Sequence, residues 1–156
     1  MPSTAELLGK RQRILVTGGA GFIGGAVVRR LLRESNAIVF NLDKMGYASD
    51  LTSINEVIQE IGVEHQNRHQ LQAINLCDAK AVQQAVKDAD PDLVMHLAAE
   101  SHVDRSISGP GVFVESNVTG TYNLLQALRS HFERLSAQRR EQFRLHHVSA
   151  EQGFGS

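Results

Sequence analysis

The sequence predicts an α/β domain built on a doubly wound parallel sheet. Strand-like apolar runs alternate with helix-like segments along the chain, which is the order typical of parallel strands joined by covering helices. A closely spaced group of glycines, Gly18, Gly19, Gly21 and Gly24, follows the first apolar run. Right-handed crossovers between successive strands favour the sheet order 3-2-1-4-5.

The apolar runs and the segments between them set the expected elements in order. Strands are expected near residues 13–17, 37–42, 70–75, 92–97 and 143–148. Helices are expected near residues 22–33, 51–60, 79–88 and 111–131, with a short one near 133–140. Such sheets bind ligands outside the carboxyl ends of their strands, at the point where the strand order reverses. We therefore expect one edge to collect the glycine turn, Asp43, Asn75, Leu97–Ser101 and Ser149.

Length and composition limit the possible classes of protein. The 156 residues suit one domain with a full core, with residues 1–11 as a polar extension and 12–156 as the domain. The 16 basic and 17 acidic residues nearly cancel, so bulk charge does not indicate nucleic-acid binding. No apolar run approaches the roughly 18 residues of a membrane span, and the amino terminus lacks a signal peptide's apolar core. We expect a cytoplasmic protein whose single cysteine, Cys77, is a small buried residue.

The first strand ends in the glycine group and passes directly into the helix-like segment Ala26–Arg33. Gly18 and Gly19 allow a tight turn, and Gly21 lets a pyrophosphate approach the backbone. Gly24 lets the helix pack closely on the strand. The pattern predicts a nucleotide-binding turn.

The start of the following helix, with Phe22 and Ile23, offers N–H groups and the positive end of the helix dipole to phosphates. Asp43 follows the second apolar run and lies about 20 residues beyond the glycines, as expected in a dinucleotide-binding unit. Its carboxylate would accept hydrogen bonds from the adenosine ribose and repel a 2′-phosphate, which favours NAD over NADP. Lys44 beside it softens that discrimination, and the alternative is that Asp43 is a solvated loop acid.

The segment after the fourth strand, His96–Ser106, is dense in polar chemistry. It holds two acids, two histidines, an arginine and two hydroxyls within eleven residues. Ala98 and Ala99 are small enough for a cofactor to lie against the backbone. The nearby polar group Ser101, His102 and Asp104 suits the hydroxyls of a sugar-like substrate. The alternative is a polar loop whose side chains satisfy one another and the next helix.

The long helix after Pro110 carries an apolar stripe with a small residue set into it. Its members are Phe113, Asn117, Gly120, Tyr122, Leu124, Leu125 and Leu128. One interpretation is core packing against the sheet. The other is a second apolar face, indicated by Phe113, Leu124 and Phe132, through which the 111–131 helix forms a homodimer.

The 7 histidines raise the question of a metal site. His146 and His147 are adjacent in a strand and must point to opposite faces, while His65, His69 and His131 show no ligand spacing. We therefore predict no metal site.

Together, the glycine turn and the segment after the fourth strand resemble the extended short-chain dehydrogenases, and more closely the dTDP-glucose 4,6-dehydratases. The resemblance rests on Thr17–Gly24, Asp43–Ala48, His96–Ser108 and Ser116–Thr121, and it runs from about Arg13 to the end. The run His-Leu-Ala-Ala-Glu-Ser-His-Val-Asp-Arg-Ser marks the dehydratase branch. The resemblance implies a Rossmann-like fold and an NAD-dependent lyase that converts dTDP-glucose to its 4-keto-6-deoxy product, in the pathway to deoxysugars such as rhamnose.

The resemblance also implies roles by position. Gly18, Gly21 and Gly24 would hold the pyrophosphate, Asp43 the adenosine ribose, and Leu97 and Ala99 the middle of the cofactor. Ser116 stands where the family has a threonine near the cofactor. The other residues expected to bind the cofactor are Phe22, Ile23, Lys44, Leu76 and Ala98. Asn75 stands where the family has an aspartate at the adenine, and its amide offers both a donor and an acceptor. The residues toward the nucleotide-sugar are Ser101, His102 and Asp104.

The catalytic positions after the fifth strand depart from the family's Ser-Thr-Asp-Glu-Val. Ala150 lacks the threonine hydroxyl, Glu151 is longer than the aspartate, and the amide of Gln152 cannot act as a general base. The sequence stops at Ser156, before the position of the family's Tyr-x-x-x-Lys pair. No other tyrosine is expected to replace that pair, because Tyr47 belongs to the adenosine end and Tyr122 to the long helix.

We therefore expect the amino-terminal portion of a family enzyme, without the carboxyl-terminal substrate region and inactive alone. Its origin is left open between a truncated reading frame, a deliberately cut chain and a degenerated paralogue, and the altered 150–153 segment favours degeneration or a scrambled end. The alternative functions are a non-catalytic NAD-binding or dimerising module and a nucleotide-sugar epimerase or decarboxylase.

Overall fold

The computed structural model describes residues 11–45, 50–97 and 110–147, with the side chains of the helix Pro110–Arg134 described from residue 118. The elements in chain order are β1 (Arg13–Thr17), α2 (Phe22–Glu34), β2 (Ile38–Leu42), α3 (Thr52–Ile61), the 3-10 helix η1 (Val63–Arg68), β3 (His69–Gln72), α4 (Ala79–Ala89), β4 (Leu93–His96), α6 (Pro110–Arg134), α7 (Ala137–Gln142) and β5 (Arg144–His147). The five strands are parallel in the order β3-β2-β1-β4-β5. The predicted fold class and strand order are confirmed.

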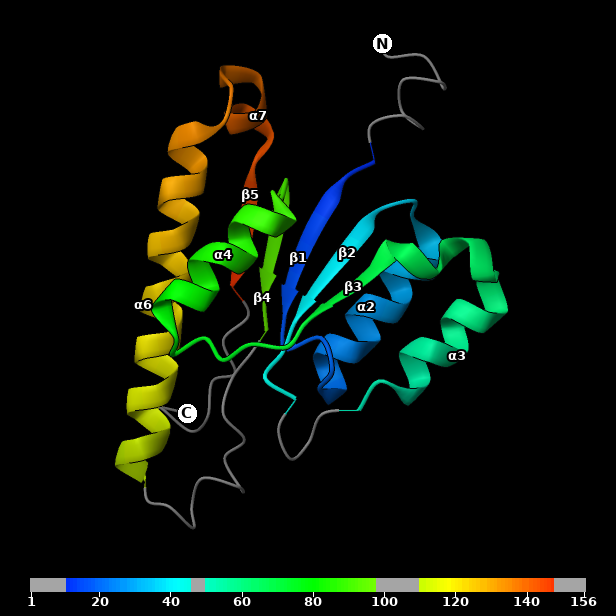
Figure 1. The fold of residues 1–156 in the computed structure, drawn as a ribbon, viewed down its shortest axis with the longest axis horizontal. Helices are drawn as coiled ribbons and strands as arrows, with labels where there is room; N and C mark the ends of the chain where they lie inside the picture. The colour runs from blue at the N-terminus through cyan, green and yellow to red at the C-terminus, as the bar shows by residue number, and fades with distance from the viewer. Residues whose placement is uncertain (1–10, 46–49, 98–109, 148–156) are drawn as a thin grey trace, which may run out of the picture.

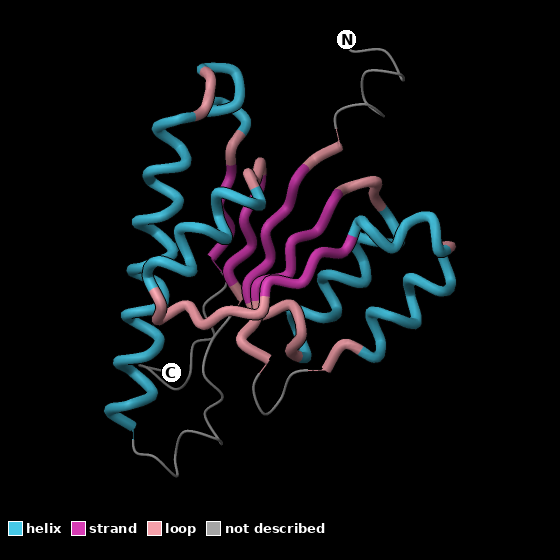
Figure 2. Tube along the Cα trace, viewed as in Figure 1, coloured by secondary structure: helices cyan, strands magenta, loops and turns pink. Residues whose placement is uncertain are grey.

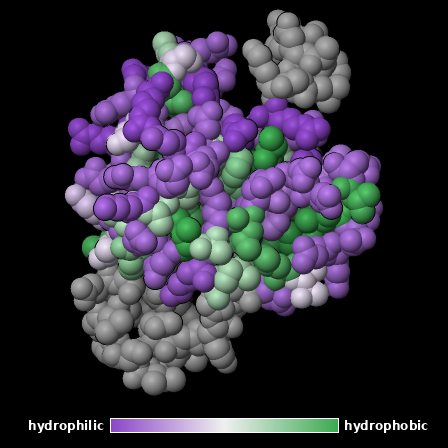
Figure 3. All heavy atoms as spheres, viewed as in Figure 1, coloured by the Kyte–Doolittle hydropathy of each residue, from purple (hydrophilic) through white to green (hydrophobic). Residues whose placement is uncertain are grey.

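Helices cover both faces of the sheet (Figures 1 and 2), and the alternation of side chains along β1 explains why. Ile14 and Val16 point to the face that packs with α2 and α3. Leu15, between them, points to the face that packs with α4 and α6. Because β1 is buried on both faces, it reads as a continuous apolar run, as expected for the central strand of a parallel sheet. On the visible surface, hydrophilic side chains cover most of the outer helix surfaces (Figure 3).

Helix α6 packs one side on α4 and presents another to the outside. Leu124 is 0% exposed and belongs to the core cluster with Ala127 and Leu128. The prediction that Leu124 contributes to a second apolar face is therefore wrong. Tyr122 and Leu125, which the core interpretation placed inward, are instead 60% and 48% exposed, because positions two before and one after Leu124 lie on another side of the helix.

Several boundaries differ from the predicted ones. β3 ends at Gln72 rather than at 75, because its partner strand stops at Leu42, which pairs with Gln72. α6 continues to Arg134. The short helix near 133–140 therefore lies later, at Ala137–Gln142, where the Ser136 side chain accepts a hydrogen bond from the Arg139 N–H and caps it.

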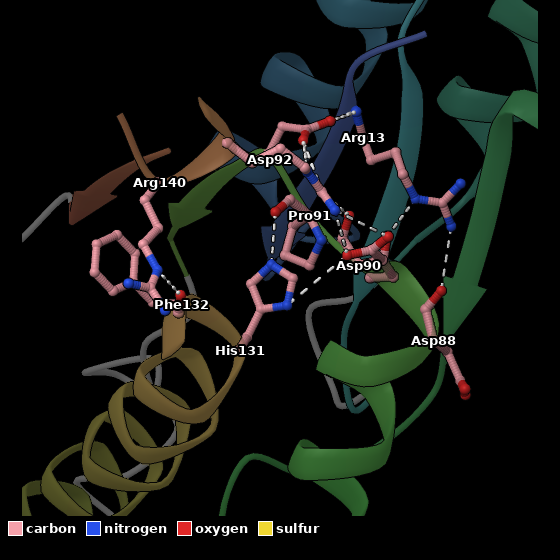
Figure 4. A network of polar contacts seen from close by, with 10 residues as sticks. Arg13, Asp88, Asp90, Pro91, Asp92, His131, Phe132 and Arg140 are labelled. Carbon is pink, nitrogen blue, oxygen red and sulfur yellow. Dashed lines mark hydrogen bonds and ion pairs between the residues drawn. The ribbon is translucent and has the colours of Figure 1, made fainter. Parts of the chain in front are cut away.

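The amino-terminal ends of β1 and β4 are joined by charged groups (Figure 4). Asp92 Oδ2 accepts from Arg13 N–H at 2.9 Å, and Asp92 Oδ1 accepts from Arg139 Nη2 at 2.8 Å. Arg139 Nη1 also contacts Asp90 at 3.1 Å. A cavity of about 350 Å³ lies nearby between α4 and α6, and its lining includes Lys87 and Arg134.

Lys87 lies in the last turn of α4, and Arg134 lies in the last turn of α6. Their positive charges complement the negative ends of the two helix dipoles. The network of Arg13, Asp90, Asp92 and Arg139 ties together the edge of the sheet opposite to the carboxyl ends of the strands. Within the described ranges, no helix is long and apolar enough to cross a membrane.

Candidate functional site

The glycine turn connects the carboxyl end of β1 to α2. Gly18 has a positive φ of 75°, which is the left-handed conformation that glycine adopts without a steric cost. Its N–H donates to Leu42 O at 2.8 Å, which ties the turn to β2. Gly21 N–H then donates to Gly18 O at 3.1 Å, and Gly25 N–H donates to Gly21 O at 2.8 Å as the helix begins. The predicted tight turn from strand to helix is confirmed.

An added Cβ would have a different consequence at each glycine of this turn. A Cβ on Gly24 would collide with Gly18 O and lie 2.6 Å from the Gly18 carbonyl carbon, so the helix can approach the strand only if residue 24 is glycine. A Cβ on Gly19 would run into the side chain of Asn41. A Cβ on Gly21 would meet Gly18 O at 3.4 Å, an ordinary contact. Packing against the described residues therefore explains glycine at 24 and not at 21.

The first turn of α2 is open to a ligand. Gly21 is the N-cap and provides no side-chain cap to the helix, and the first N–H groups of any α-helix lack intrahelical partners. Phe22 is 93% exposed, and Ile23 is also exposed. An anion at this position would meet backbone N–H groups and the positive end of the helix dipole.

Asp43 lies beside the glycine turn, at the carboxyl end of β2, and is only 7% exposed. Its Oδ2 accepts from Ala20 N–H at 3.0 Å, and its Oδ1 accepts from Met45 N–H at 2.7 Å. The alternative of a solvated loop acid is therefore wrong. Each carboxylate oxygen has a second lone pair, so the side chain can anchor the turn and still accept from a ligand. Lys44 is exposed next to it.

The loop after β3 reaches the same edge of the sheet. Asn75 is exposed, and its Oδ1 accepts from Cys77 N–H at 2.9 Å. The prediction that Cys77 is buried is wrong, because this Asx turn holds it on the exposed loop before α4. Half-buried Leu76 is held by α6, since its carbonyl oxygen accepts from Asn123 Nδ2 at 2.8 Å. A Cβ on Gly120 would lie 3.0 Å from Leu76 Cβ.

A partly buried chain of polar contacts runs from Thr17 through His96 to Thr121 at the carboxyl end of β4. Leu97 N–H donates to both Thr17 O at 3.2 Å and Thr17 Oγ1 at 3.0 Å. Thr17 Oγ1 also contacts His96 Nδ1 at 2.6 Å, and His96 Nε2 contacts Thr121 Oγ1 at 3.1 Å. The sequence placed Thr17, His96 and Thr121 inside motifs but gave none of them a role in the site, and it missed Asn123. No sequence signal indicated that His96 contacts Thr17 and Thr121.

Burial lowers the pKa of His96 to about 4 from its ordinary value of 6.5, and the stacked ring of His147 adds to the effect. The folded protein therefore favours neutral His96, whereas the unfolded chain takes up a proton near pH 6.5. The unfolded state binds more protons in this window, so stability falls as pH decreases through it. We expect His96 to account for a loss of about 2 kcal/mol in the free energy of unfolding between about pH 7 and pH 5.

Urea denaturation of the wild type and of His96→Asn at these two pH values measures this contribution. The variant should lose less stability than the wild type on acidification, because asparagine does not titrate. Equal losses in the two proteins would show that His96 does not cause the effect.

The remaining predicted site residues are not all described. Ala98, Ala99, Ser101, His102 and Asp104, together with Ser149, Ala150, Glu151 and Gln152, lie outside the described residues. Ser116 lies on α6, where only its backbone is described. The described members of the predicted edge, namely the glycine turn, Asp43, the Asn75 loop and Leu97, follow the converging carboxyl ends of the strands (Figure 1). Among the residues that can be examined, no group of three or more His, Cys, Asp or Glu side chains is placed to hold a metal ion.

Comparison with known proteins relates the whole described domain to nucleotide-sugar enzymes. The sequence matches the family described as GDP-mannose 4,6 dehydratase over residues 15–156. It is 42% identical over 143 residues to the dTDP-glucose 4,6-dehydratase of Salmonella typhimurium, a match that covers 92% of this chain and 38% of that protein. The chain thus spans well under half the length of this curated relative.

Two solved structures share the fold. One is a dTDP-glucose 4,6-dehydratase from Bacillus anthracis in complex with NAD, with a TM-score of 0.65 and 27% identity, covering 88% of this chain and 37% of its own. The other is a UDP-glucose 4-epimerase from Stenotrophomonas maltophila with bound NAD, with a TM-score of 0.65 and 25% identity, covering 90% of this chain and 38% of its own. The backbone is therefore common to dehydratases and epimerases.

Proposed function

Because the chain belongs to the GDP-mannose 4,6-dehydratase family, we propose that it is the NAD-binding, amino-terminal portion of a dTDP-glucose 4,6-dehydratase. The observation that carries the proposal is the pairing of an open glycine turn with a buried carboxylate. Gly21 has no packing reason to be glycine among the described residues, and Asp43 lies one hydrogen bond away, on Ala20 N–H. A dinucleotide explains both features, since its pyrophosphate needs close backbone approach and its ribose needs an acceptor.

Each end of the cofactor has a proposed place. The pyrophosphate would lie on the first turn of α2, and the adenosine ribose would donate to Asp43. The Asn75 side chain would face the adenine through Nδ2, since its Oδ1 already accepts from Cys77 N–H. Leu97 uses its N–H on Thr17, so it would offer its carbonyl and side chain to the middle of the cofactor. Bound NAD⁺ supplies a hydride acceptor that is regenerated when the hydride returns to the product.

The substrate assignment rests on the family. The relatives' names are those of dTDP-glucose 4,6-dehydratases, and the segment with Ser101, His102 and Asp104 carries the dehydratase pattern rather than that of an epimerase. We propose a nucleotide-sugar, dTDP-glucose, as the substrate of the complete enzyme. A second candidate, a non-catalytic NAD-binding module, is favoured by the substitutions Ala150, Glu151 and Gln152 at the catalytic positions.

An activity assay on dTDP-glucose tests the non-catalytic candidate, which any turnover by this chain would contradict. We expect the 156-residue chain to give no detectable 4-keto-6-deoxy product, because a missing acid or base commonly costs about a hundred- to ten-thousand-fold and these positions combine several losses. A chromatographic assay with a related full-length dehydratase as the positive control measures this. Turnover by the purified chain would contradict the module interpretation, and an epimerised sugar as the product would contradict the dehydratase assignment.

We further propose that α6 pairs with α6 of a second copy. Val118, Tyr122 and Leu125 are exposed at a spacing of four and three residues, so they form one apolar stripe along the helix. Phe132 continues the stripe near its end, although Arg140 and Phe143 already contact its ring. Two copies related by a two-fold axis would bury this stripe against itself.

We expect Leu125→Glu to shift the protein to a monomer in sedimentation, because it places a charge at the centre of the paired stripe. Val63→Glu is the matched control, since Val63 is also an exposed apolar residue but lies on η1. A wild-type chain that is monomeric at high concentration would rule out this interface.

A further inference from the structure

We propose that His96 is a positioning residue that sets the affinity of the site for its dinucleotide. It does so by fixing the carboxyl ends of β1 and β4 to helix α6. The inference rests on the proposed function for its ligand and goes beyond it in assigning a role to a residue that would not touch that ligand. His96 is 3% exposed and lies at the carboxyl end of β4. Its two ring nitrogens contact different elements.

The Nδ1 side holds the two strand ends that meet the cofactor. Thr17 directly precedes Gly18, and its hydroxyl lies 2.6 Å from His96 Nδ1. The same hydroxyl oxygen accepts from Leu97 N–H at 3.0 Å. One hydroxyl therefore joins the start of the glycine turn to the residue after β4, and the imidazole fixes where that hydroxyl lies.

The Nε2 side holds helix α6, through Thr121 Oγ1 at 3.1 Å. The neighbouring turn of α6 also fixes the adenine side of the site, since Gly120 packs on Leu76 and Asn123 donates to the Leu76 carbonyl. Residues 120 to 123 thus connect the loop after β3 to His96 at the end of β4. His96 is the only described side chain that extends this connection to Thr17.

The hydrogen-bonding capacities of the groups are consistent with this role. Thr17 Oγ1 already accepts from Leu97 N–H, so its own hydroxyl proton can be donated to Nδ1 while Nε2–H is donated to Thr121. In that neutral tautomer, every polar atom of the chain has a partner. Loss of the ring would leave the buried Thr17 hydroxyl, the half-buried Thr121 hydroxyl and a strand end without their common support.

Calorimetric titration of the chain with NAD⁺ tests the proposal. We expect His96→Leu to weaken binding at least about tenfold, the effect of one or more lost hydrogen bonds. His96→Asn should recover most of the affinity, because its amide reaches the position of Nδ1 and can contact Thr17. His96→Gln reaches toward Nε2 and should recover less. This order of rescue would not arise from a general loss of stability.

His131→Leu is the matched control. His131 is also buried, and its Nε2 contacts a backbone oxygen, Pro91 O, at 2.8 Å, at the opposite edge of the sheet. We expect this variant to lose stability and to keep the wild-type affinity. A folded His96→Leu with wild-type affinity would overturn the proposal, as would an equal loss of affinity in His131→Leu. If His96→Leu does not fold, Thr121→Val, which removes the Nε2 contact, takes its place and should weaken binding severalfold; wild-type affinity in that variant would overturn the proposal.

A second readout does not depend on the cofactor. In the protein without NAD⁺, hydrogen exchange of the Leu97 amide should accelerate about tenfold in His96→Leu and stay unchanged in His131→Leu. If the wild type does not bind NAD⁺, the proposed function fails, while Leu97 exchange still reports on the His96 connection. Unchanged exchange in a folded His96→Leu would show that His96 does not fix this strand end.

Discussion

Gly24→Ala is expected to disrupt the glycine turn and abolish cofactor binding together. The added Cβ would collide with Gly18 O, and it would lie 2.6 Å from the Gly18 carbonyl carbon and 3.0 Å from Gly19 Cα. All three atoms belong to the backbone, so no side chain can rotate away, and α2 must move off β1. We expect a loss of about 3 kcal/mol in the free energy of unfolding, at the upper end for overpacking, and no measurable NAD⁺ binding.

Gly25→Ala is the control for this variant. Its Cβ would lie 3.4 Å from Arg29 Nη1 and 3.5 Å from Gly19 O, which are tolerable contacts, and alanine favours the helix by about 1 kcal/mol over glycine. Urea denaturation and calorimetry on both variants compare the effects. A Gly24→Ala protein with wild-type stability and affinity would contradict the packing role of Gly24.

Asp43→Asn is expected to have the second largest effect. The carboxylate accepts from two backbone N–H groups, Ala20 on Oδ2 and Met45 on Oδ1. An amide has one oxygen, so its NH₂ group must face one of these donors, and the ribose loses its acceptor as well. Hydrogen bonds to charged groups contribute about 1.5–3 kcal/mol each. We therefore expect a loss of about 2 kcal/mol in stability and about 100-fold in NAD⁺ affinity.

Asp78→Asn is the matched control, because Asp78 caps α4 by accepting from Ala81 N–H and asparagine is an equally good N-cap. We expect that variant to behave as the wild type in denaturation and in titration with NAD⁺. Titration with NADP⁺ adds a specificity readout, since removing the Asp43 charge should reduce the preference for NAD⁺. An unchanged preference in Asp43→Asn would contradict placement of the ribose beside this carboxylate.

Much of this fold could be predicted because local patterns and tertiary structure agree along the chain. The apolar run of β1 ends in Gly18, where the backbone needs a positive φ, and Asp43 follows β2 at the distance of a dinucleotide-binding unit. Parallel strands bring their carboxyl ends to one edge, so the order of elements alone indicated that the glycine turn, Asp43 and Leu97 would lie near one another. Both the motif spacing and the shared edge of the strands can be read from the order and spacing of residues along the chain.

Apart from Cys77, which a local Asx turn holds at the surface, the errors concern features that depend on partners distant in the sequence. β3 ends early because β2 ends, and strand propensity does not record the length of a partner. Leu124 and Leu125 are equally apolar, yet only the packing of α6 on α4 decides that Leu124 is buried. His96 could not be recognised as part of a chain from Thr17 to Thr121, because its contacts span 79 and 25 residues of sequence.

The most direct test of the proposed function is a calorimetric titration of the folded chain with NAD⁺, with Asp43→Ala and NADP⁺ as controls and circular dichroism to verify folding. Saturable binding of NAD⁺ that weakens in Asp43→Ala and with NADP⁺ is the result that the geometry of the glycine turn and of Asp43 predicts. A folded chain that shows no saturable binding, or that binds equally well without the Asp43 carboxylate, would contradict the assignment of this edge of the sheet as an NAD site.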